Sequence, residues 1–156
     1  MPTVFIGVGS NLGEREKNIR RAKDCLGSVR GIRFLACSQI RETEPVGGPS
    51  AQKKYLNAVW QIETELKPRK LLEHFMKIER ELGRVRKLKN EPRVIDLDIL
   101  FYDQDVIDVP HLTIPHPRLH ERGFVLEPMA ELAPDFIHPQ FKKNIKTLLD
   151  ELHEDH

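Results

Sequence analysis

The chain has 156 residues, of which 39% are hydrophobic and 31% are charged, and its formal net charge is +1. This length predicts a single domain over 1–156 with a core that needs no disulfides or structural metals. The near-zero net charge argues against a dedicated nucleic-acid binder or a protein held on anionic membranes.

The cysteines and the N-terminal residues bear on the compartment. Two cysteines without a CxxC pair predict a reduced, cytoplasmic setting. The first residues lead directly into an apolar segment without a basic leader, and the apolar runs fall short of the ~18 residues that span a bilayer. We therefore expect no membrane association.

The chain begins with a strand-like pattern followed by a helical one. Residues 3–8 are rich in β-branched and aromatic residues and end at a glycine-rich segment, 9–13, which predicts a strand and a turn. Apolar residues at helical spacing then predict a helix that ends at Gly27.

Two alternating segments follow. Residues 32–41 predict a second strand, with Phe34 and Ile40 on one face. A loop rich in Pro and Gly covers 42–50, and a third strand is predicted over 55–66.

The next segments contain the clearest strand. A helix is predicted from Pro68 to a glycine cap at Gly83, and a basic loop at 84–93 leads to a strand at 94–102. Alternation puts four apolar residues on one face: Ile95, Leu97, Ile99 and Phe101. The opposite face carries Asp96, Asp98, Leu100 and Tyr102.

The remaining residues are predicted to be loop, with a short helix near Val125–Leu132 and an appended amphipathic helix at the C-terminus. The element order is strand, helix, strand, strand, helix, strand. This order predicts an α+β, ferredoxin-like fold, in which an antiparallel sheet has helices packed on one face.

Asp96-Leu97-Asp98 is the strongest local signal of chemistry. In a strand the two aspartates share a face, with Cα atoms about 7 Å apart. Burying neighbouring carboxylates unpaired is unfavourable, and a divalent cation removes that conflict. Oxygen ligands without cysteine or clustered histidine favour magnesium. A solvated face, paired with nearby arginines, is the alternative.

Basic residues adjoin this pair along the chain. The loop before it contains Arg84, Arg86, Lys87, Lys89 and Arg93. A basic loop next to a carboxylate pair is expected where a metal-bound polyphosphate lies between them. A solvated charge run that neutralises the aspartates is the other interpretation. A second group could close the site from another loop: His116, Arg118, His120 and Arg122.

Two further segments have both a functional and a structural interpretation. Residues 9–13 resemble a phosphate-binding loop only loosely, and a glycine turn with Ser10 or Asn11 at a helix start is favoured. The sequence lacks the phosphate-loop motif of P-loop kinases. Tyr55 and Asn57 share a strand face, where they either bind a flat heterocycle or pack under a loop.

Six short stretches, spread from residue 7 to about 135, point to a family. They are Gly9-Ser10-Asn11-Leu12, Thr43 with Pro45 and Gly47, Tyr55-Leu56-Asn57-Ala58, Ile78-Glu79 with Gly83-Arg84-Val85-Arg86, Pro92 to Ile99, and Pro115-His116 with Arg122-Gly123-Phe124. In this order they resemble the 6-hydroxymethyl-7,8-dihydropterin pyrophosphokinases. The Arg-x-x-Asp-Leu-Asp-Ile stretch with the Pro-His and Arg-Gly-Phe stretches is highly specific.

The resemblance implies transfer of the β,γ-diphosphate of ATP to the pterin hydroxymethyl group, with release of AMP, in folate biosynthesis. It implies two Mg²⁺ ions on Asp96 and Asp98, with ATP as co-substrate. The implied substrate-binding residues are Thr43, Val46, Tyr55, Asn57 and Phe124. The implied ATP-binding residues are Glu79, Arg84, Arg86, Arg93, His116 and Arg122. Arg84 and Arg93 are implied to be catalytic together with the two aspartates.

The expected partners are accordingly the small molecules pterin and ATP, without nucleic acid or membrane, and the expected state is a monomer. The loop at 87–91 departs from the family pattern: Lys89-Asn90-Glu91 precede Pro92 where many members have an arginine, an aromatic residue and a glycine. Lys87 or Lys89 replaces that arginine only as a point charge. No residue is identified as a general base.

Two rival functions stay open at this point. A magnesium-dependent phosphohydrolase would use the same carboxylates with water as the nucleophile. A non-catalytic RNA-binding sheet is compatible with the fold, because such sheets stack bases on aromatic side chains. The near-neutral charge and the paired aspartates disfavour the RNA-binding function.

Overall fold

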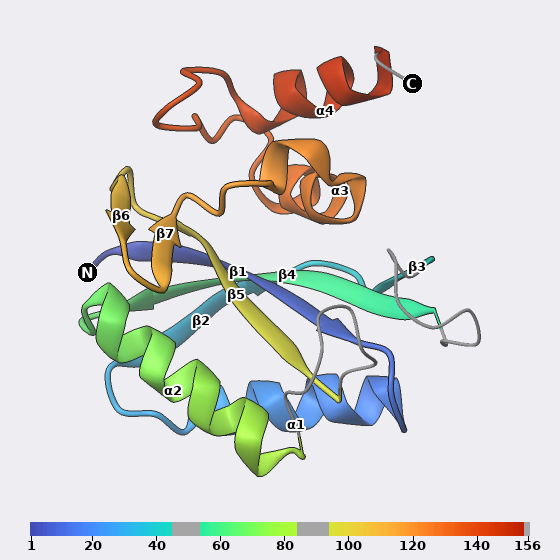
Figure 1. Cartoon of the computed structure of the whole chain (residues 1–156), viewed down its shortest axis with the longest axis vertical. Coiled ribbons are helices and arrows are strands. Elements are labelled where there is room, and N and C mark those ends of the chain that lie inside the picture. The colour runs from blue at the N-terminus through green and yellow to red at the C-terminus, as the bar shows by residue number, and fades with distance from the viewer. Residues whose placement is uncertain (45–53, 84–93, 155–156) are drawn as a thin grey trace.

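An antiparallel sheet with helices on both faces forms the body of the molecule (Figure 1). The computed structural model describes residues 1–44, 54–83 and 94–154. The sheet strands are β1 (Thr3–Ser10), β2 (Ile32–Cys37), β3 (Arg41–Thr43), β4 (Tyr55–Thr64) and β5 (Asp96–Tyr102). The helical elements are α1 (Arg15–Gly27), α2 (Pro68–Glu81), the 3-10 turn η1 (Leu119–Glu121), α3 (Gly123–Leu132) and α4 (Ile145–Glu154).

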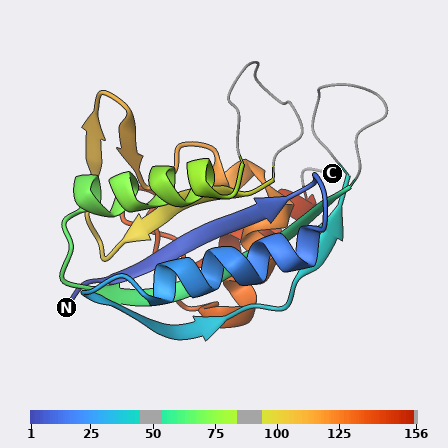
Figure 2. The same ribbon diagram turned by 90° about the horizontal axis from the view of Figure 1, so that it is seen from below.

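The strand order confirms the predicted ferredoxin-like fold. It is β2-β4-β1-β5, with the short β3 paired to β4. Both crossover helices, α1 and α2, lie on one face of this sheet (Figure 2). The appended α3 packs on the other face, with α4 outside it (Figure 1). The prediction of helices on a single face therefore holds for the split repeat, and the appended helices, for which no face was predicted, cover the other face.

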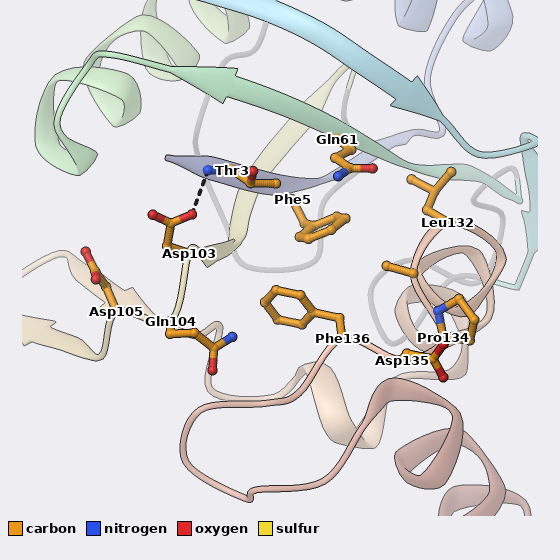
Figure 3. A pocket seen from close by; sticks show the side chains of 11 residues that line it. Thr3, Phe5, Gln61, Asp103, Gln104, Asp105, Leu132, Pro134, Asp135 and Phe136 are labelled. Carbon is orange, nitrogen blue, oxygen red and sulfur yellow. Dashed lines mark hydrogen bonds between the residues drawn. The ribbon is translucent and has the colours of Figure 1, made fainter. Parts of the chain in front are cut away.

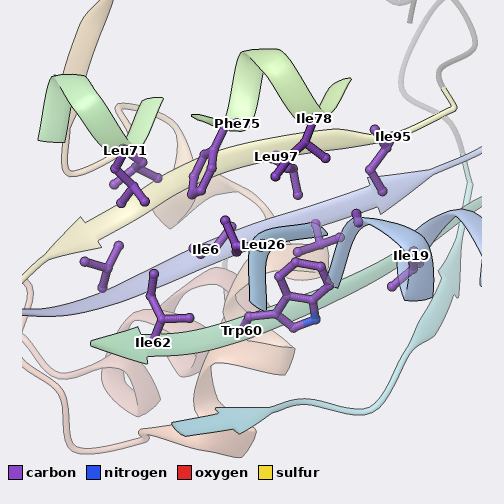
Figure 4. Packing of buried hydrophobic residues seen from close by; sticks show 14 of the residues in the cluster. Ile6, Ile19, Leu26, Trp60, Ile62, Leu71, Phe75, Ile78, Ile95 and Leu97 are labelled. Carbon is purple, nitrogen blue, oxygen red and sulfur yellow. The ribbon is translucent and has the colours of Figure 1, made fainter. Parts of the chain in front are cut away.

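Two hydrophobic clusters hold these layers together. The larger lies between the sheet and the helices α1 and α2, and it includes the fully buried Leu26, Trp60 and Phe75 (Figure 4). The second lies between the sheet and α3 with α4, around Phe5 and Met129. Each large apolar side chain that is fully buried stabilises the fold by about 1.5–3 kcal/mol. The sheet is therefore anchored on both faces.

The predicted strand at 32–41 is two strands. Ser38 lies at the break, where its Oγ accepts a bond from the Val59 N–H at 2.8 Å and its own N–H donates to the Val59 carbonyl at 2.9 Å. The register with β4 also shifts between Phe34 and Ala36. The prediction that Ile40 shares a strand face with Phe34 is wrong, since Ile40 lies between the two strands, where it is 42% exposed.

A β-bulge in β5 reverses part of the predicted alternation. Ile6 pairs with Ile99 and Phe5 with Phe101, so Leu100 is the extra residue. A bulge moves the following side chains to the opposite face. Phe101 consequently lies in the α3 cluster and Tyr102 in the cluster under α1 and α2, the reverse of the prediction.

The segment after β5 was predicted to be loop and contains a hairpin. Its strands are β6 (Ile107–Val109) and β7 (Leu112–Ile114), with His111 at a φ of +67° in the turn. Strands of three residues are too short to show a clear alternation. The helices predicted from Pro68, near Val125–Leu132 and at the C-terminus are confirmed. Among the described residues, no helix has the length and apolar character of a membrane span.

Candidate active site

Three of the predicted substrate- and metal-binding residues, Asn57, Asp96 and Asp98, lie where β1 ends and β5 begins. Directly paired residues of antiparallel strands project from the same face of a sheet. The register pairs Gly9 with Asn57 on one side and with Asp96 on the other. Gly9 lies on the same face of β1 as Phe5, which belongs to the α3 cluster. Asn57 and Asp96 therefore project from the α3 face.

Glycine gives this surface its shape. A Cβ at Gly9 would lie 3.2 Å from Asn57 Oδ1 and 3.4 Å from Tyr55 Cδ1. The side chains of β4 thus lie across the backbone of β1, so close that a Cβ at Gly9 would force a neighbouring side chain to shift. Gly7 occupies the next position on this face and pairs with Asp98. Neither glycine places a side chain between the β4 residues and the aspartates.

The Asn57 amide is buried, with 8% of the residue exposed. Its Nδ2 donates a short hydrogen bond to the Thr43 Oγ1 of β3. Buried amides are costly unless bonded, so this contact sets the orientation of the side chain. Oδ1 is left on the Gly9 side, toward the middle of the sheet, where it can accept a bond from a ligand.

The two aspartates are half-buried on β5, and Leu97 between them points to the opposite face. The Leu97 N–H donates to Glu79 Oε2 at 2.9 Å. Glu79 is a buried residue of α2, 7% exposed, on the far side of the sheet from the aspartates. This contact gives Glu79 a role in holding the start of β5; its predicted role in ATP binding stays a prediction.

His116 and Arg122 approach the aspartates from the segment after β7. The His116 N–H donates to the Leu100 carbonyl at 3.1 Å, and its Nδ1 accepts from the Arg118 N–H at 3.3 Å. Burial, and next the charge of Arg122, lower the pKa of His116 to about 4, while Asp96 opposes that shift. The imidazole is therefore neutral at pH 7, with Nε2 as its N–H donor.

Arg122 connects His116 and the two aspartates with α3. Its Cζ lies 5.6 Å from the centre of the Phe124 ring, a cation–π distance. The structure thereby brings together many of the residues predicted for the site: Thr43, Tyr55, Asn57, Asp96, Asp98, His116, Arg122 and Phe124. Val46, Arg84, Arg86, Arg93 and the loop at 87–91 lie outside the described residues.

Other predicted candidates face elsewhere or have structural contacts. Arg118 Nε pairs with Glu121 at 3.2 Å, and the His120 ring packs against Phe141 with centres 4.7 Å apart. Of the four candidates between residues 116 and 122, mainly His116 and Arg122 therefore belong to the candidate site.

The structure favours the turn interpretation for residues 9–13. Asn18 Nδ2 donates to the Leu12 carbonyl at 2.8 Å and lies 3.4 Å from Ser10 Oγ. Gly13 has a φ of +73°. Ser10 and Asn11 are buried. These contacts describe a packed turn before α1 rather than a cradle open to phosphate.

Sequence reasoning missed two side chains next to the site. Arg41 of β3 pairs across the ladder with Asn57, and its Nη2 lies 2.8 Å from Oε1 of Glu131 on α3. Arg41 stands two residues before Thr43, a spacing that puts both on one strand face. That spacing was the sequence signal that could have identified Arg41. Glu131 is distant in the chain, and no sequence pattern connects it with the site.

A cleft of about 820 Å³ lies at the other end of the sheet, between the start of β1 and the segment after α3 (Figure 3). Phe5 and Phe136 form part of its wall, with Asp103, Asp105 and Asp135 around it. None of the predicted site residues lines it. The cleft is therefore separate from the candidate site at the Asp96 end of the sheet.

The chain matches the family model described as 7,8-dihydro-6-hydroxymethylpterin-pyrophosphokinase (HPPK) over residues 5–134. "Folic acid synthesis protein fol1" of Schizosaccharomyces pombe is 40% identical over 148 residues, which are 95% of this chain and 20% of that protein. In Pneumocystis carinii the protein of the same name is 43% identical, and the match covers 87% of this chain and 18% of that protein. The chain thus spans about a fifth of the length of these relatives.

Shorter relatives match over most of their length. The 2-amino-4-hydroxy-6-hydroxymethyldihydropteridine pyrophosphokinase of Pseudomonas aeruginosa is 40% identical, over 85% of this chain and 81% of that protein. The crystal structure of Plasmodium falciparum HPPK-DHPS wild type with pteroate has a TM-score of 0.77 at 14% identity. That match covers 96% of this chain and 42% of the other, and it shows a shared fold.

Proposed function

The chain belongs to the 7,8-dihydro-6-hydroxymethylpterin-pyrophosphokinase family, and on that premise we propose that it transfers the diphosphate of ATP to 6-hydroxymethyl-7,8-dihydropterin in folate biosynthesis. The alignment of Asn57, Gly9 and Asp96 across three strands carries the proposal. It sets an amide suited to a heterocycle and a carboxylate suited to a metal–nucleotide on one face of the sheet.

The pterin would lie on the β4 side of this surface. Asn57 Oδ1, held over Gly9, would accept a bond from an N–H of the aminopyrimidine edge. Tyr55 and Phe124, from β4 and α3, would stack on the two faces of the ring, with Thr43 and Val46 at its edge. Stacking and the amide together would fix the direction of the hydroxymethyl group.

The donor set of Asp96 and Asp98 fits magnesium. Both supply only carboxylate oxygens, the ligands that Mg²⁺ prefers. In the described part of the chain, no group of three or more His, Cys, Asp or Glu residues is placed to hold a metal. Two carboxylates would leave coordination positions for phosphate oxygens and water, as is usual for Mg²⁺ at nucleotide sites. We propose that they hold two ions; when bound, magnesium supplies charge neutralisation on the triphosphate.

The chain's own residues would act by position and charge. The hydroxymethyl oxygen attacks the β-phosphorus, the bond between that phosphorus and the α–β bridging oxygen breaks, and AMP leaves with the electron pair. The hydroxyl proton passes to water. Arg122 and the neutral His116 would face the phosphates beside Asp96. Arg84, Arg86 and Arg93 are proposed as further ATP contacts, with Arg84 and Arg93 catalytic, on the sequence resemblance alone.

The test is a mixture of ATP, magnesium and reduced hydroxymethylpterin with the purified chain. We expect AMP and pterin diphosphate in equal amounts and none of either when the pterin is omitted. Phosphate release from ATP without pterin would favour a phosphohydrolase instead. Strongly salt-dependent binding of single-stranded RNA, with no product formed, would favour the RNA-binding module.

We extend the proposal to a monomer that acts in the cytoplasm on these small molecules. The two free cysteines, Cys25 and Cys37, are usual for a reducing compartment. Sedimentation of the purified chain at increasing concentration tests the monomer, and a mass that rises toward twice that of the chain would contradict it.

A further inference from the structure

The backbone pairing of β3 with β4 is too short to fix the position of β3 by itself. It is only three residues long, Arg41–Thr43, and it pairs with β4 at the margin of the sheet (Figure 1). So short a strand contributes few ladder hydrogen bonds. Nevertheless Thr43, its last residue, accepts the bond that orients the Asn57 amide. Other contacts must therefore keep β3 in place.

One set of contacts reaches β3 from the α3 face. Glu131 of α3 accepts two hydrogen bonds with its two oxygens. Oε1 pairs with Arg41 Nη2 at 2.8 Å, and Oε2 accepts from the Gln39 N–H at 2.9 Å. One carboxylate thus joins α3 to both β3 and the residues that lead into it. Arg41 and Thr43 project from the same face of β3, so this contact lies beside the Thr43–Asn57 bond.

A second set reaches β3 from the opposite face. Glu42, between Arg41 and Thr43, points toward α1. Arg15, the first residue of α1, donates through Nη1 to Glu42 Oε2 at 3.0 Å and to the Lys54 carbonyl at 2.7 Å. Lys54 directly precedes β4. One guanidinium therefore ties β3 to the residue that enters β4.

The two ion pairs, Arg41–Glu131 and Arg15–Glu42, are not explained by their contribution to the stability of the fold alone. Both ion pairs are partly exposed, with side-chain exposures of 32% and 30% for Arg41 and Glu131 and of 26% and 47% for Arg15 and Glu42. Exposed ion pairs add little to stability. Arg41 Nη1 is moreover buried without a hydrogen-bond partner among the described residues.

We propose that Glu131 and Arg15 are positioning residues that hold β3 from its two faces, keep Thr43 against Asn57, and so direct Asn57 Oδ1 at the pterin. The statement about the pterin rests on the proposed function. These ion pairs and hydrogen bonds join Glu131 and Arg15 to β3 and to the residues that flank it, not to Asp96, Asp98, His116 or Arg122. Loss of either contact would therefore act on pterin binding and leave ATP binding nearly unchanged.

The kinetic experiment compares Glu131→Ala, Arg15→Met and a matched control, Arg33→Met. Arg33 pairs with Glu63 across β2 and β4 of the same sheet, far from β3. We expect KM for the pterin to rise about tenfold in the first two variants, since weakening one hydrogen bond to a ligand changes its affinity by about that factor. KM for ATP and the melting temperature should change little, and the control should match the unmodified chain.

Thr43 supplies a test by conservative replacement. Thr43→Val removes the acceptor for Asn57 and should raise KM for the pterin as Glu131→Ala does, whereas Thr43→Ser should restore it. An equal rise in KM for pterin and ATP in the Glu131 and Arg15 variants would overturn the proposal. An unchanged KM for both substrates would overturn it as well.

A measurement without substrate separates this proposal from the proposed function. The side-chain NH₂ of Asn57, assigned by its loss in Asn57→Asp, should give a slowly exchanging signal in a ¹H–¹⁵N spectrum. That protection should disappear in Thr43→Val and Glu131→Ala and persist in Arg33→Met. Persistence in Glu131→Ala refutes the positioning role, whether or not the chain forms pterin diphosphate.

Discussion

Gly9→Ala is the substitution that most directly tests the geometry of the site. The added methyl group would lie 3.2 Å from Asn57 Oδ1 and 3.4 Å from Tyr55 Cδ1, so one of these side chains must move by a few tenths of an ångström. Asn57 is tied to Thr43 through Nδ2 and cannot rotate freely away. The substitution therefore displaces the amide oxygen or breaks its bond to Thr43.

The energies involved predict how far Gly9→Ala changes the stability of the fold and the affinity for the pterin. Overpacking costs about 1–3 kcal/mol, and replacing glycine by alanine within a strand recovers about 0.5–1 kcal/mol. We therefore expect a loss of about 1 kcal/mol in the free energy of unfolding, or a few degrees in Tm. A weakened hydrogen bond of about 1–1.5 kcal/mol corresponds to about a tenfold rise in the Kd for the pterin.

Calorimetry with the reduced pterin and a non-hydrolysable ATP analogue measures the binding change, and urea unfolding measures the stability. Gly27→Ala is the control, because its Cβ would meet Phe34 only at 3.8 Å, an ordinary contact on the other face of the sheet. A Kd for the pterin within twofold of the unmodified chain in Gly9→Ala would refute the argument that Gly9 shapes the binding surface.

Three further substitutions test other parts of the structure. Asp96→Asn should lower the rate of diphosphate transfer by about 10²-fold or more, because it removes a charge that the metal–nucleotide needs, and near-normal turnover would contradict the assignment. Glu79→Ala leaves the buried Leu97 N–H without its acceptor and should cost about 1–3 kcal/mol in urea unfolding; an unchanged midpoint would contradict that role. His138 is buried, with Nδ1 accepting the N–H groups of Gln140 and Phe141. Burial, and then the charge of His120, lower its pKa from 6.5 to about 4. Above pH 6.5 both the folded and the unfolded state carry the neutral His138 ring. Between pH 6.5 and 4 the ring is protonated only in the unfolded state, so the free energy of unfolding should fall by about 3 kcal/mol by pH 4. His138→Asn keeps an acceptor that does not titrate, and its unfolding midpoint should depend less on pH over that range; an equal dependence would argue against His138 as the cause.

Much of the fold could be predicted because its signals are local. The strand at 94–102 and the helix from Pro68 to Gly83 show their periodicity within a dozen residues, and the order of elements then limits the topology. The errors occurred where a long-range contact changes a local pattern. Ser38 interrupts a strand through its bonds to Val59, and the bulge at Leu100 is visible only in the pairing of β5 with β1.

In the candidate site, too, some features follow from local sequence and others from long-range contacts. Asp96 and Asp98 share a face because side chains alternate along any strand, so the sequence alone determined their common direction and the oxygen-only character of the pair. Tertiary structure decided what lies beside them. The register sets Asn57, Gly9 and Asp96 in one row, and Glu131 of α3 meets Arg41 of β3 across 90 positions of the chain. Strand register and the packing of a distant helix depend on the balance of all contacts in the fold, and no short stretch of residues encodes that balance.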